Sequence, residues 1–317
     1  GLVLPGFNFL TMTTNTDDVG DGLDNDADAL VDEAVGHGTF IAGLIHLIAP
    51  EARILPVVVL DSDGFGEVFD IALGIYYAID HGVEVINLSL GSSGESSAVH
   101  DAVSEARRLG IVVVSAAGND NRREPVRHPA SSGDNIGVAA TDENDIRASF
   151  SNYSSNLFLS APGTSVTFGG GQFDPNHSIL STIPGGEFAV WEGTSMSTAF
   201  VSGAAALIRA QHPEWQSQSD TVQSIEILLA STAINIDLLN PGFVGELGFG
   251  RLDIGAAVAL GPPQPKIADL DGDGDVDLAD LAQILVDFGA VHSSADINAD
   301  GQVGLTDLAI LLLHFGA

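Results

Sequence analysis

Three short motifs hold side chains that together could carry out nucleophilic acyl transfer. His37 lies between two glycines, Asn119 ends the run 116–119 (AAGN), and Ser195 lies within 193–196 (GTSM). A serine hydroxyl becomes a nucleophile when a base takes its proton, and imidazole is suited to that task near neutral pH. A side-chain amide can donate to the oxyanion that forms, which is worth about 3–4 kcal/mol in the barrier. Each motif alone also fits a loop residue, a strand-end turn or a helix N-cap, so the prediction depends on their conjunction.

The elements around these motifs are expected to bring them to one edge of a sheet. Apolar runs predict strands at 53–60, 83–90, 111–115, 136–140 and 157–160, and amphipathic spacing predicts helices at 68–81, 97–109, 194–210 and 219–230. Continuous apolar strands separated by helices indicate an α/β fold with a parallel sheet covered on both faces. Asn119 follows a strand and Ser195 opens a helix, so both are expected near the carboxyl edge, where such folds bind ligands.

Seven segments in order resemble the subtilisin-like serine peptidases, the subtilase or S8 peptidase family. They are GHGTFIAGLI (36–45), VINLSLG (85–91), VVSAAGN (113–119), ASFSNYS (148–154), LSAPG (159–163), GTSMSTAFVSGAAALI (193–208) and GFGRLDIGAA (248–257). The resemblance implies a three-layer, parallel-sheet subtilisin-like domain over residues 1–260. It also implies a serine endopeptidase that hydrolyses polypeptide substrates through an acyl-enzyme.

The same resemblance implies a role for each motif residue. His37 would be the general base, Ser195 the nucleophile, and Asn119 the oxyanion donor together with the backbone N–H of Ser195. The substrate channel and its main specificity pocket would be lined by two segments, Ser89, Leu90 and Gly91, and Ala116, Ala117 and Gly118. An extended peptide would add there as a further strand.

The acidic member of the triad is missing from this pattern. The family carries it on a first strand before the histidine, as Asp followed by Thr-Gly or Ser-Gly, and no such tripeptide occurs in the chain. Residues 1–9 resemble the segment after that strand, so the strand and its Asp are expected upstream of Gly1. Asp61 ends an apolar run but follows His37, and Asp17, Asp18 and Asp21 lie in a Gly-rich loop and are poor substitutes. We therefore expect poor activity from the chain as given.

Composition excludes several classes of function. The 317 residues include 43 Asp and Glu against 10 Lys and Arg, a net charge of −33, which excludes a basic nucleic-acid surface and a polybasic membrane anchor. No apolar run approaches the roughly 20 residues of a membrane span, so membrane insertion is not expected. The absence of cysteine excludes disulfides, thiolate metal sites and a cysteine nucleophile. No signal peptide is visible, and a secreted bacterial protein is predicted from the habit of the family.

A second, small acidic domain is predicted at 266–317, after a proline-rich linker at 261–265. Segments 269–289 and 296–316 repeat each other, and each opens with oxygen ligands at loop positions 1, 3 and 5, Gly at 6 and Asp at 12, a pattern that suits Ca²⁺. The predicted ligands are Asp269, Asp271, Asp273, Asp275 (through its carbonyl) and Asp280, and then Asp296, Asn298, Asp300, Gln302 (through its carbonyl) and Asp307.

Two calcium loops, each followed by one helix, resemble a type I dockerin module, which is a small all-α, EF-hand-like domain. A short EF-hand pair is the alternative. The resemblance implies a cohesin-type protein partner, although only Thr306 remains of the usual hydroxyl pairs at loop positions 10 and 11. A further acidic cluster at 24–28 (DNDAD) is either a calcium site or a solvated loop.

Two functions therefore remain open for the whole chain. One is a calcium-binding serine endopeptidase with a docking module. The other is an inactive or truncated pseudopeptidase that acts as a calcium-dependent, cohesin-docking protein. The missing Asp separates them, because it orients the histidine and stabilises its charged form.

Overall fold

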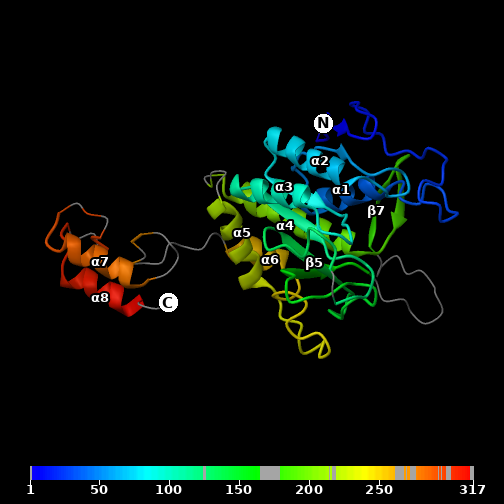
Figure 1. Ribbon diagram of the computed structural model, residues 1–317. Coiled ribbons are helices and arrows are strands. Elements are labelled where there is room, and N and C mark those ends of the chain that lie inside the picture. The colour runs from blue at the N-terminus through cyan, green and yellow to red at the C-terminus, as the bar shows by residue number, and fades with distance from the viewer. Residues whose placement is uncertain are drawn as a thin grey trace. The chain divides into compact units, whose positions relative to one another are not determined.

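The computed structural model describes residues 2–123, 126–164, 179–213, 215, 219–260, 268, 270–271, 276–291, 293, 295–297 and 301–314. The chain divides into two compact units, Gly1–Gly261 and Pro262–Ala317 (Figure 1). The predicted linker at 261–265 lies outside the described residues, as do Asp269, Asp273, Asp275, Asn298 and Asp300. No helix of the described part of the chain is long and apolar enough to cross a bilayer.

A four-stranded parallel sheet forms the centre of the large unit. It has the order β3 (Val85–Leu88), β4 (Val112–Ala116), β5 (Ile136–Thr141) and β6 (Leu159–Pro162). Every residue of β4 and β5 is buried, as expected of strands covered on both faces. The predicted parallel α/β sheet is confirmed.

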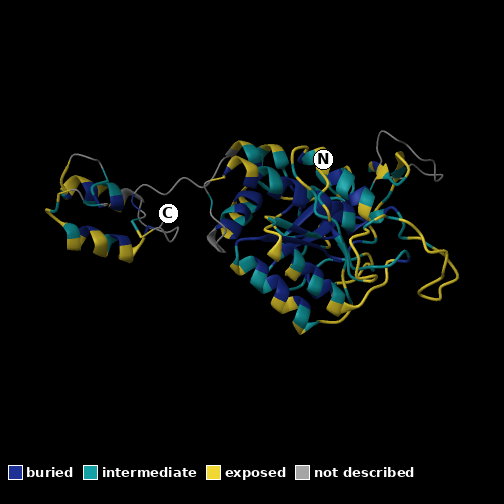
Figure 2. Cartoon of the chain, turned by 90° about the horizontal axis from the view of Figure 1, so that it is seen from above, coloured by how far each residue is buried: buried dark blue, intermediate teal, exposed yellow. Residues whose placement is uncertain are grey.

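Helices cover both faces of this sheet and complete two cores (Figure 2). On one face pack α4 (Thr194–Gln211), α5 (Ser219–Thr232) and α6 (Ile254–Leu260), and on the other α2 (Val68–Asp80) and α3 (Ser97–Arg108). Val112 and Val114 of β4 belong to the first core and Val113 to the second, because successive strand side chains point to opposite faces.

A separate pair of short strands lies beside α2. β1 (Phe7–Asn8) pairs in parallel with β2 (Val57–Val58), and no ladder joins this pair to β3 within the described residues. The strand predicted at 53–60 is therefore shortened to two residues. Pro56 supplies no N–H for a ladder, and among the residues that the structure describes β2 has a strand partner on one edge only.

An antiparallel hairpin and one more helix complete the large unit. The hairpin is β7 (Leu180–Ile183) and β8 (Glu187–Val190), which the apolar pattern does not reveal, and β7 packs beside α1 (His37–Ile48). Helices α1 and α4 cross closely where Ile48 meets Gly203. A Cβ at position 203 would lie only 2.7 Å from Ile48 Cβ, so the approach depends on the glycine. This crossing sets the helix that begins at His37 against the helix that carries Ser195.

The small unit contains α7 (Leu278–Asp287) and α8 (Leu305–His314) around a core of its own. Among the described residues, the six buried hydrophobic side chains of this core form pairs separated by the 27-residue offset of the sequence repeat: Ala268 with Ala295, Val276 with Val303, and Ile284 with Leu311. The two halves of the repeat therefore supply equivalent positions to one shared core.

Candidate active site

Ser195 lies in the first turn of α4, the helix that packs against the central sheet. The helix begins at Thr194, after Gly193, whose φ of 152° is a conformation that favours glycine. The Ser195 hydroxyl donates to the carbonyl oxygen of Ser89 at 3.2 Å, and Ser89 Oγ donates to the Ser195 carbonyl at 2.8 Å. Ser89 comes directly after β3, so the nucleophile and one predicted wall of the substrate channel are tied together.

Asn119 follows β4 and is oriented by Thr194. Both the backbone N–H and the hydroxyl of Thr194 donate to Asn119 Oδ1, each at 2.9 Å. Because a backbone N–H can only donate, the oxygen of the amide faces Thr194 and its Nδ2 points elsewhere. No acceptor for Nδ2 occurs among the described residues, and the side chain is exposed. An amide fixed in this way has both N–H groups available for an oxyanion.

Thr194 is a residue that motif reasoning missed. Its side chain is buried, and Thr194 Oγ1 also accepts from the backbone N–H of Gly118 at 3.1 Å. One hydroxyl therefore links the end of β4 to the start of α4. The signal in the sequence was its position directly before Ser195, where a side chain oxygen commonly serves the helix end.

His37 is the first residue of α1 and is held by the hairpin. Its ring packs edge-to-face on Trp191, with 5.6 Å between ring centroids, and Trp191 comes directly after β8. Ser181 of β7 donates to the carbonyl oxygen of Phe40 at 2.8 Å, which fixes the hairpin to the first turns of α1. Burial lowers the pKa of His37 below its usual value, and the charge of Asp18 partly opposes this shift. A neutral imidazole at neutral pH suits a general base.

Asp18 caps the helix that begins at His37. Its carboxylate accepts from the backbone N–H groups of Gly36 (2.8 Å) and Thr39 (3.0 Å) and from the Thr39 hydroxyl (2.6 Å). A carboxylate there satisfies free N–H groups and complements the helix dipole. The sequence presented Asp18 only as a poor substitute for the triad acid. The structure brings its charge close enough to act on His37, yet no hydrogen bond joins this carboxylate to the imidazole among the described residues.

The two helix starts pack against each other, but the Ser–His hydrogen bond is not formed. Phe40 and Leu44 of α1 share a core with Met196 and Ala199 of α4. The Ser195 hydroxyl bonds to Ser89 and not to His37.

Asp61, which ends an apolar run in the sequence, lies in a turn. Its carboxylate accepts from the N–H groups of Asp63 and Phe65, at 3.1 and 2.8 Å.

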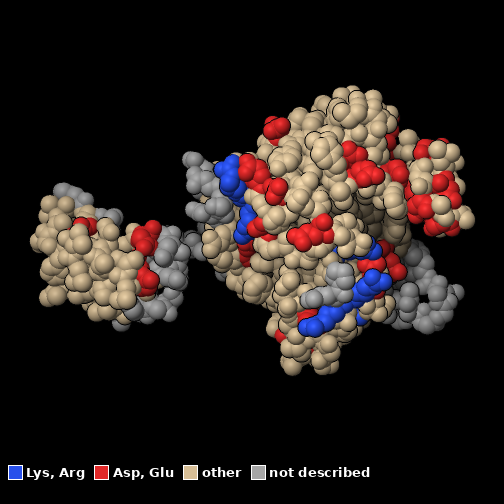
Figure 3. All heavy atoms as spheres, viewed as in Figure 1, with Lys and Arg blue, Asp and Glu red and all other residues tan. Residues whose placement is uncertain are grey.

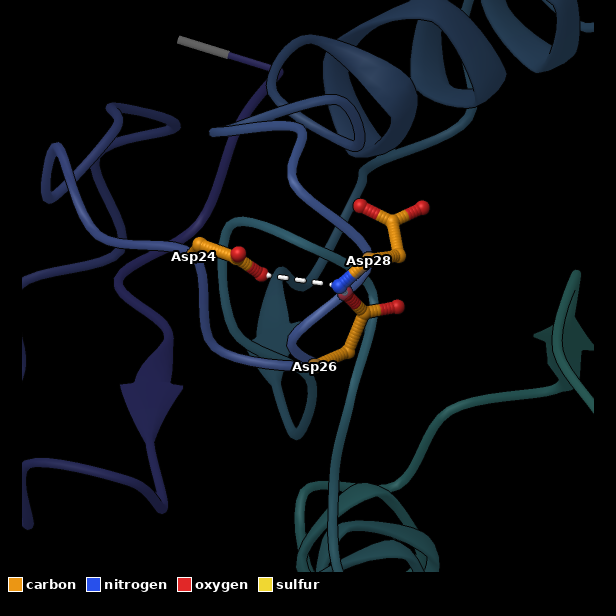
Figure 4. A group of neighbouring side chains, drawn as sticks. All are labelled: Asp24, Asp26 and Asp28. Atoms are coloured by element: carbon orange, nitrogen blue, oxygen red, sulfur yellow. Dashed lines mark hydrogen bonds between the residues drawn. The ribbon is translucent and has the colours of Figure 1, made fainter.

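The acidic loop at 17–33 brings three carboxylates together. Oxygens of Asp24, Asp26 and Asp28 lie within 4.8 Å of one another. Figure 4 shows the first two turned toward the backbone N–H of Asp28, which donates to them at 3.1 and 3.2 Å. Burial, together with the neighbouring carboxylates, raises the pKa of Asp26 above its ordinary value. The buried Asp63 anchors the loop by accepting from the N–H of Asp32 at 2.6 Å.

Comparison with known proteins agrees with the motifs and the fold. Residues 9–250 match the family model described as the subtilase family. Subtilisin BL of Lederbergia lenta is 39% identical over 189 residues, which is 57% of this chain and 65% of that protein. Alkaline elastase YaB of Bacillus sp. (strain YaB) is 35% identical over 236 residues, 72% of this chain and 56% of the elastase. The match thus spans 56 to 65% of the length of these curated relatives, less than two thirds of either.

Solved structures of proteases superpose on the large part of the chain. A protease from Pseudoalteromonas arctica PAMC 21717 is 31% identical with a TM-score of 0.65, covering 81% of this chain and 84% of the other. A lanthipeptide protease, 24% identical, has a TM-score of 0.68 over 81% and 82% of the two chains, and shows the fold alone. The motifs, the parallel sheet and these matches lead to one conclusion: the chain belongs to the subtilase family.

Proposed function

We propose that the large unit is a serine endopeptidase domain that hydrolyses peptide bonds through an acyl-enzyme. The observation that carries the proposal is the double hydrogen bond from Thr194 to Asn119 Oδ1, which leaves Nδ2 free beside the start of α4. Ser195 attacks the substrate carbonyl, His37 takes the hydroxyl proton, and Asn119 Nδ2 with the Ser195 backbone N–H stabilises the oxyanion. For this, the Ser195 hydroxyl must turn from Ser89 toward His37.

The substrate lies between the segments that follow β3 and β4. These are the proposed channel residues Ser89, Leu90 and Gly91 on one side and Ala116, Ala117 and Gly118 on the other. Ser89 already bonds to both the hydroxyl and the carbonyl of Ser195, so a peptide held along this segment would have its scissile bond beside the nucleophile. Backbone hydrogen bonds would hold it as an added strand, and the pocket between the two segments would select its side chain.

The missing carboxylate is proposed to come from a strand upstream of residue 1, placed between β2 and β3. Within the described part of the chain, each of these strands has a ladder on one edge only, to β1 and to β4 respectively. Helix α2 packs against both strands. A Cβ on Gly74 would lie 2.7 Å from Cγ1 of Val59, the residue after β2, and Ile71 and Ile75 share a core with Ile86 of β3. A parallel strand there would join the two sheets and end near His37, at the common carboxyl edge.

The small unit is proposed to bind calcium and to dock onto another protein of the cohesin type. Asp280 and Asp307 are fully buried, and Asp280 accepts from the N–H groups of Leu270, Asp271 and Asp277 at 2.6, 3.2 and 2.8 Å. Burial alone raises the pKa of Asp280, but these backbone N–H groups outweigh it and lower the pKa. A buried, ionised carboxylate at loop position 12 fits a cation site, where Ca²⁺ would neutralise it and fix the loop.

Exposed apolar side chains favour the docking role. Leu278 and Leu305 are 71% and 75% exposed, and they occupy equivalent positions at the start of α7 and α8. Leu285 and Leu312 are likewise exposed at equivalent positions. Repeated apolar positions on the surface of a small domain are typical of a protein-binding face. We also propose an extracellular location, which is the expectation that follows from the resemblance to the subtilase family.

A pseudopeptidase is the second candidate function for the chain as given. It is favoured by the Ser195 hydroxyl, which bonds to Ser89, and by the lack of a carboxylate hydrogen-bonded to the His37 ring among the described residues. In that case docking through the small unit would be the remaining activity.

Covalent labelling separates the two candidates. A fluorophosphonate probe should modify Ser195 slowly in the chain as given, and a Ser195→Ala variant should stay unlabelled. His37→Ala should lower the rate further, because the imidazole is the proposed base. Extending the chain upstream through an Asp-bearing strand should raise the rate by up to about 10⁴-fold, near the effect of the acid in the related enzyme subtilisin. Labelling of the folded protein at a rate unaffected by His37→Ala, or no labelling even after the extension, would contradict the peptidase proposal.

A further inference from the structure

Basic residues gather beside the proposed oxyanion donor, in a chain with very few of them. Arg122, Arg123 and Arg127 lie in the loop that follows Asn119, and Arg147 reaches the same loop by donating to Asn121 Oδ1 at 2.9 Å. These are four of the ten Lys and Arg residues of a chain with net charge −33. Figure 3 shows that the positive residues on one face of the large unit gather in a few places, amid scattered negative charge.

Arg127 lies between the two glycines of the proposed pocket walls. A Cβ on Gly91 would lie 2.8 Å from Arg127 Cβ, and a Cβ on Gly118 would lie 2.4 Å from Arg127 Cγ. The backbone N–H of Arg127 donates to the carbonyl of Ala117 at 3.1 Å, which holds the residue against the second wall. The aliphatic part of Arg127 therefore fills the space between the walls, where a long aromatic substrate side chain would otherwise enter.

The guanidinium of Arg127 is fixed by Asp120, the residue after Asn119. Nε donates to Asp120 Oδ2 at 2.8 Å and Nη2 to Oδ1 at 2.7 Å, so the pair is bidentate. Asn152 Nδ2 also donates to Asp120 Oδ2, at 3.2 Å. Nη1 has no acceptor among the described residues, and the Arg127 side chain is 33% exposed. An oriented guanidinium with a free donor edge is the group best suited to a carboxylate.

The local charge also favours an acidic ligand. Arg127 and Asp120 neutralise each other, and the hydrogen bonds from Arg127 hold the pKa of Asp120 below its ordinary value, with a smaller contribution from the charge of Arg122. Arg122 is exposed and has no ion-pair partner among the described residues, so its positive charge is not neutralised there. A substrate Lys or Arg would meet like charge at this point. A Glu or Asp side chain would meet the free Nη1 edge.

We propose that Arg127, held in place by Asp120, selects substrates with an acidic side chain on the residue whose carbonyl Ser195 attacks. The inference rests on the proposed peptidase function and names the substrate class of that site. Because Asp120 already takes two of the guanidinium donors, the selectivity is moderate, about tenfold for Glu over the isosteric Gln.

The test uses peptidyl phosphonates that differ only in the side chain beside the reactive phosphorus. Each phosphonate modifies Ser195 once and covalently, so the measurement does not need multiple turnovers and suits a slow enzyme. Second-order rates of Ser195 modification are measured by intact mass for Glu, Gln, Phe and Lys side chains. We expect Glu to react fastest, about tenfold faster than Gln. In Arg127→Ala the Glu/Gln ratio should fall to about one and the Phe compound should gain. Asp120→Asn frees the guanidinium, so there the ratio should rise.

Arg108→Ala is the matched control, because Arg108 is exposed on α3 and pairs only with Glu105 in the described structure. It removes one positive charge away from the pocket and should leave the ratio unchanged. Thermal unfolding checks that Arg127→Ala still folds. If that variant does not fold, the test uses Arg127→Gln, which keeps most of the aliphatic part of the arginine side chain. A wild-type protein that prefers Phe or Lys, or an unchanged ratio in the Arg127 variant, overturns the inference. No reaction with any phosphonate, in the chain as given and in the chain extended upstream through an Asp-bearing strand, would instead refute the peptidase proposal, and this inference with it.

Discussion

Replacing Asp18 by Asn tests how the acidic loop acts on the proposed catalytic base. The Asp18 carboxylate accepts from Gly36, from the Thr39 N–H and from the Thr39 hydroxyl, and its charge raises the otherwise lowered pKa of His37. Asn keeps one oxygen acceptor and the shape of the side chain but removes the charge. Without the negative charge the imidazolium is less stable, so the pKa of His37 should fall further below its usual value.

The size of the shift follows from Coulomb's law. For any two unit charges about 6 Å apart, which is the outer end of the range over which an opposite charge shifts a pKa, Coulomb's law gives about 0.7–1.4 kcal/mol at an effective dielectric constant of about 40 to 80. Asp18→Asn removes an interaction of this size that favours the imidazolium, so the pKa of His37 should fall. Raising the ionic strength should shrink the difference to the extent that solvent reaches the pair.

Nuclear magnetic resonance titration of the imidazole measures this pKa without requiring activity. The His37 signal is identified by its loss in His37→Gln. Asp18→Ala is the comparison variant, because it removes both the charge and the cap and should also lower the free energy of unfolding by about 1 kcal/mol. An unchanged or raised pKa of His37 in Asp18→Asn would refute the electrostatic role. A shift in Asp18→Ala alone would assign the effect to the cap and not to the charge.

Three further outcomes are expected. Thr194→Val loses the hydroxyl that donates to Asn119 and accepts from Gly118, so the rate of Ser195 labelling should fall about tenfold. Thr194→Ser keeps this hydroxyl and should label at a rate near that of the wild type. Equal losses in both variants would contradict the role of the Thr194 hydroxyl in orienting Asn119. Calorimetric titration should find two calcium sites in the wild type and one in either Asp280→Asn or Asp307→Asn; unchanged stoichiometry would exclude these carboxylates as ligands. The pKa of Asp280 is lowered from 3.8, so its ionised carboxylate stabilises the folded, calcium-free small unit above that pH, and this stabilisation is lost as the pH falls through the lower folded value. Far-ultraviolet circular dichroism against pH should therefore show acid unfolding in that range. Asp280→Asn should remove this pH dependence.

Much of the fold follows from local pattern. The helix at 68–81 and the strand at 136–140 differ from α2 and β5 by one residue each, because strong periodicity and short turns bound them. The hairpin β7–β8 has few buried side chains and so leaves little apolar signal, although it supports the helix that begins at His37. Long-range pairing decides such elements, as it also shortens β2.

The amino-acid sequence by itself determined the chemical groups available: a histidine, a serine and an amide in the order of the subtilase motifs, and a duplicated acidic loop with equivalent core positions in each half. The tertiary structure alone decided which distant side chains act on them. Asp18 caps the helix of His37, Thr194 orients Asn119, and Arg127 fills the space between Gly91 and Gly118. The physical reason is that periodicity reports which face of an element is buried, whereas these contacts arise where loops meet at the ends of the packed elements.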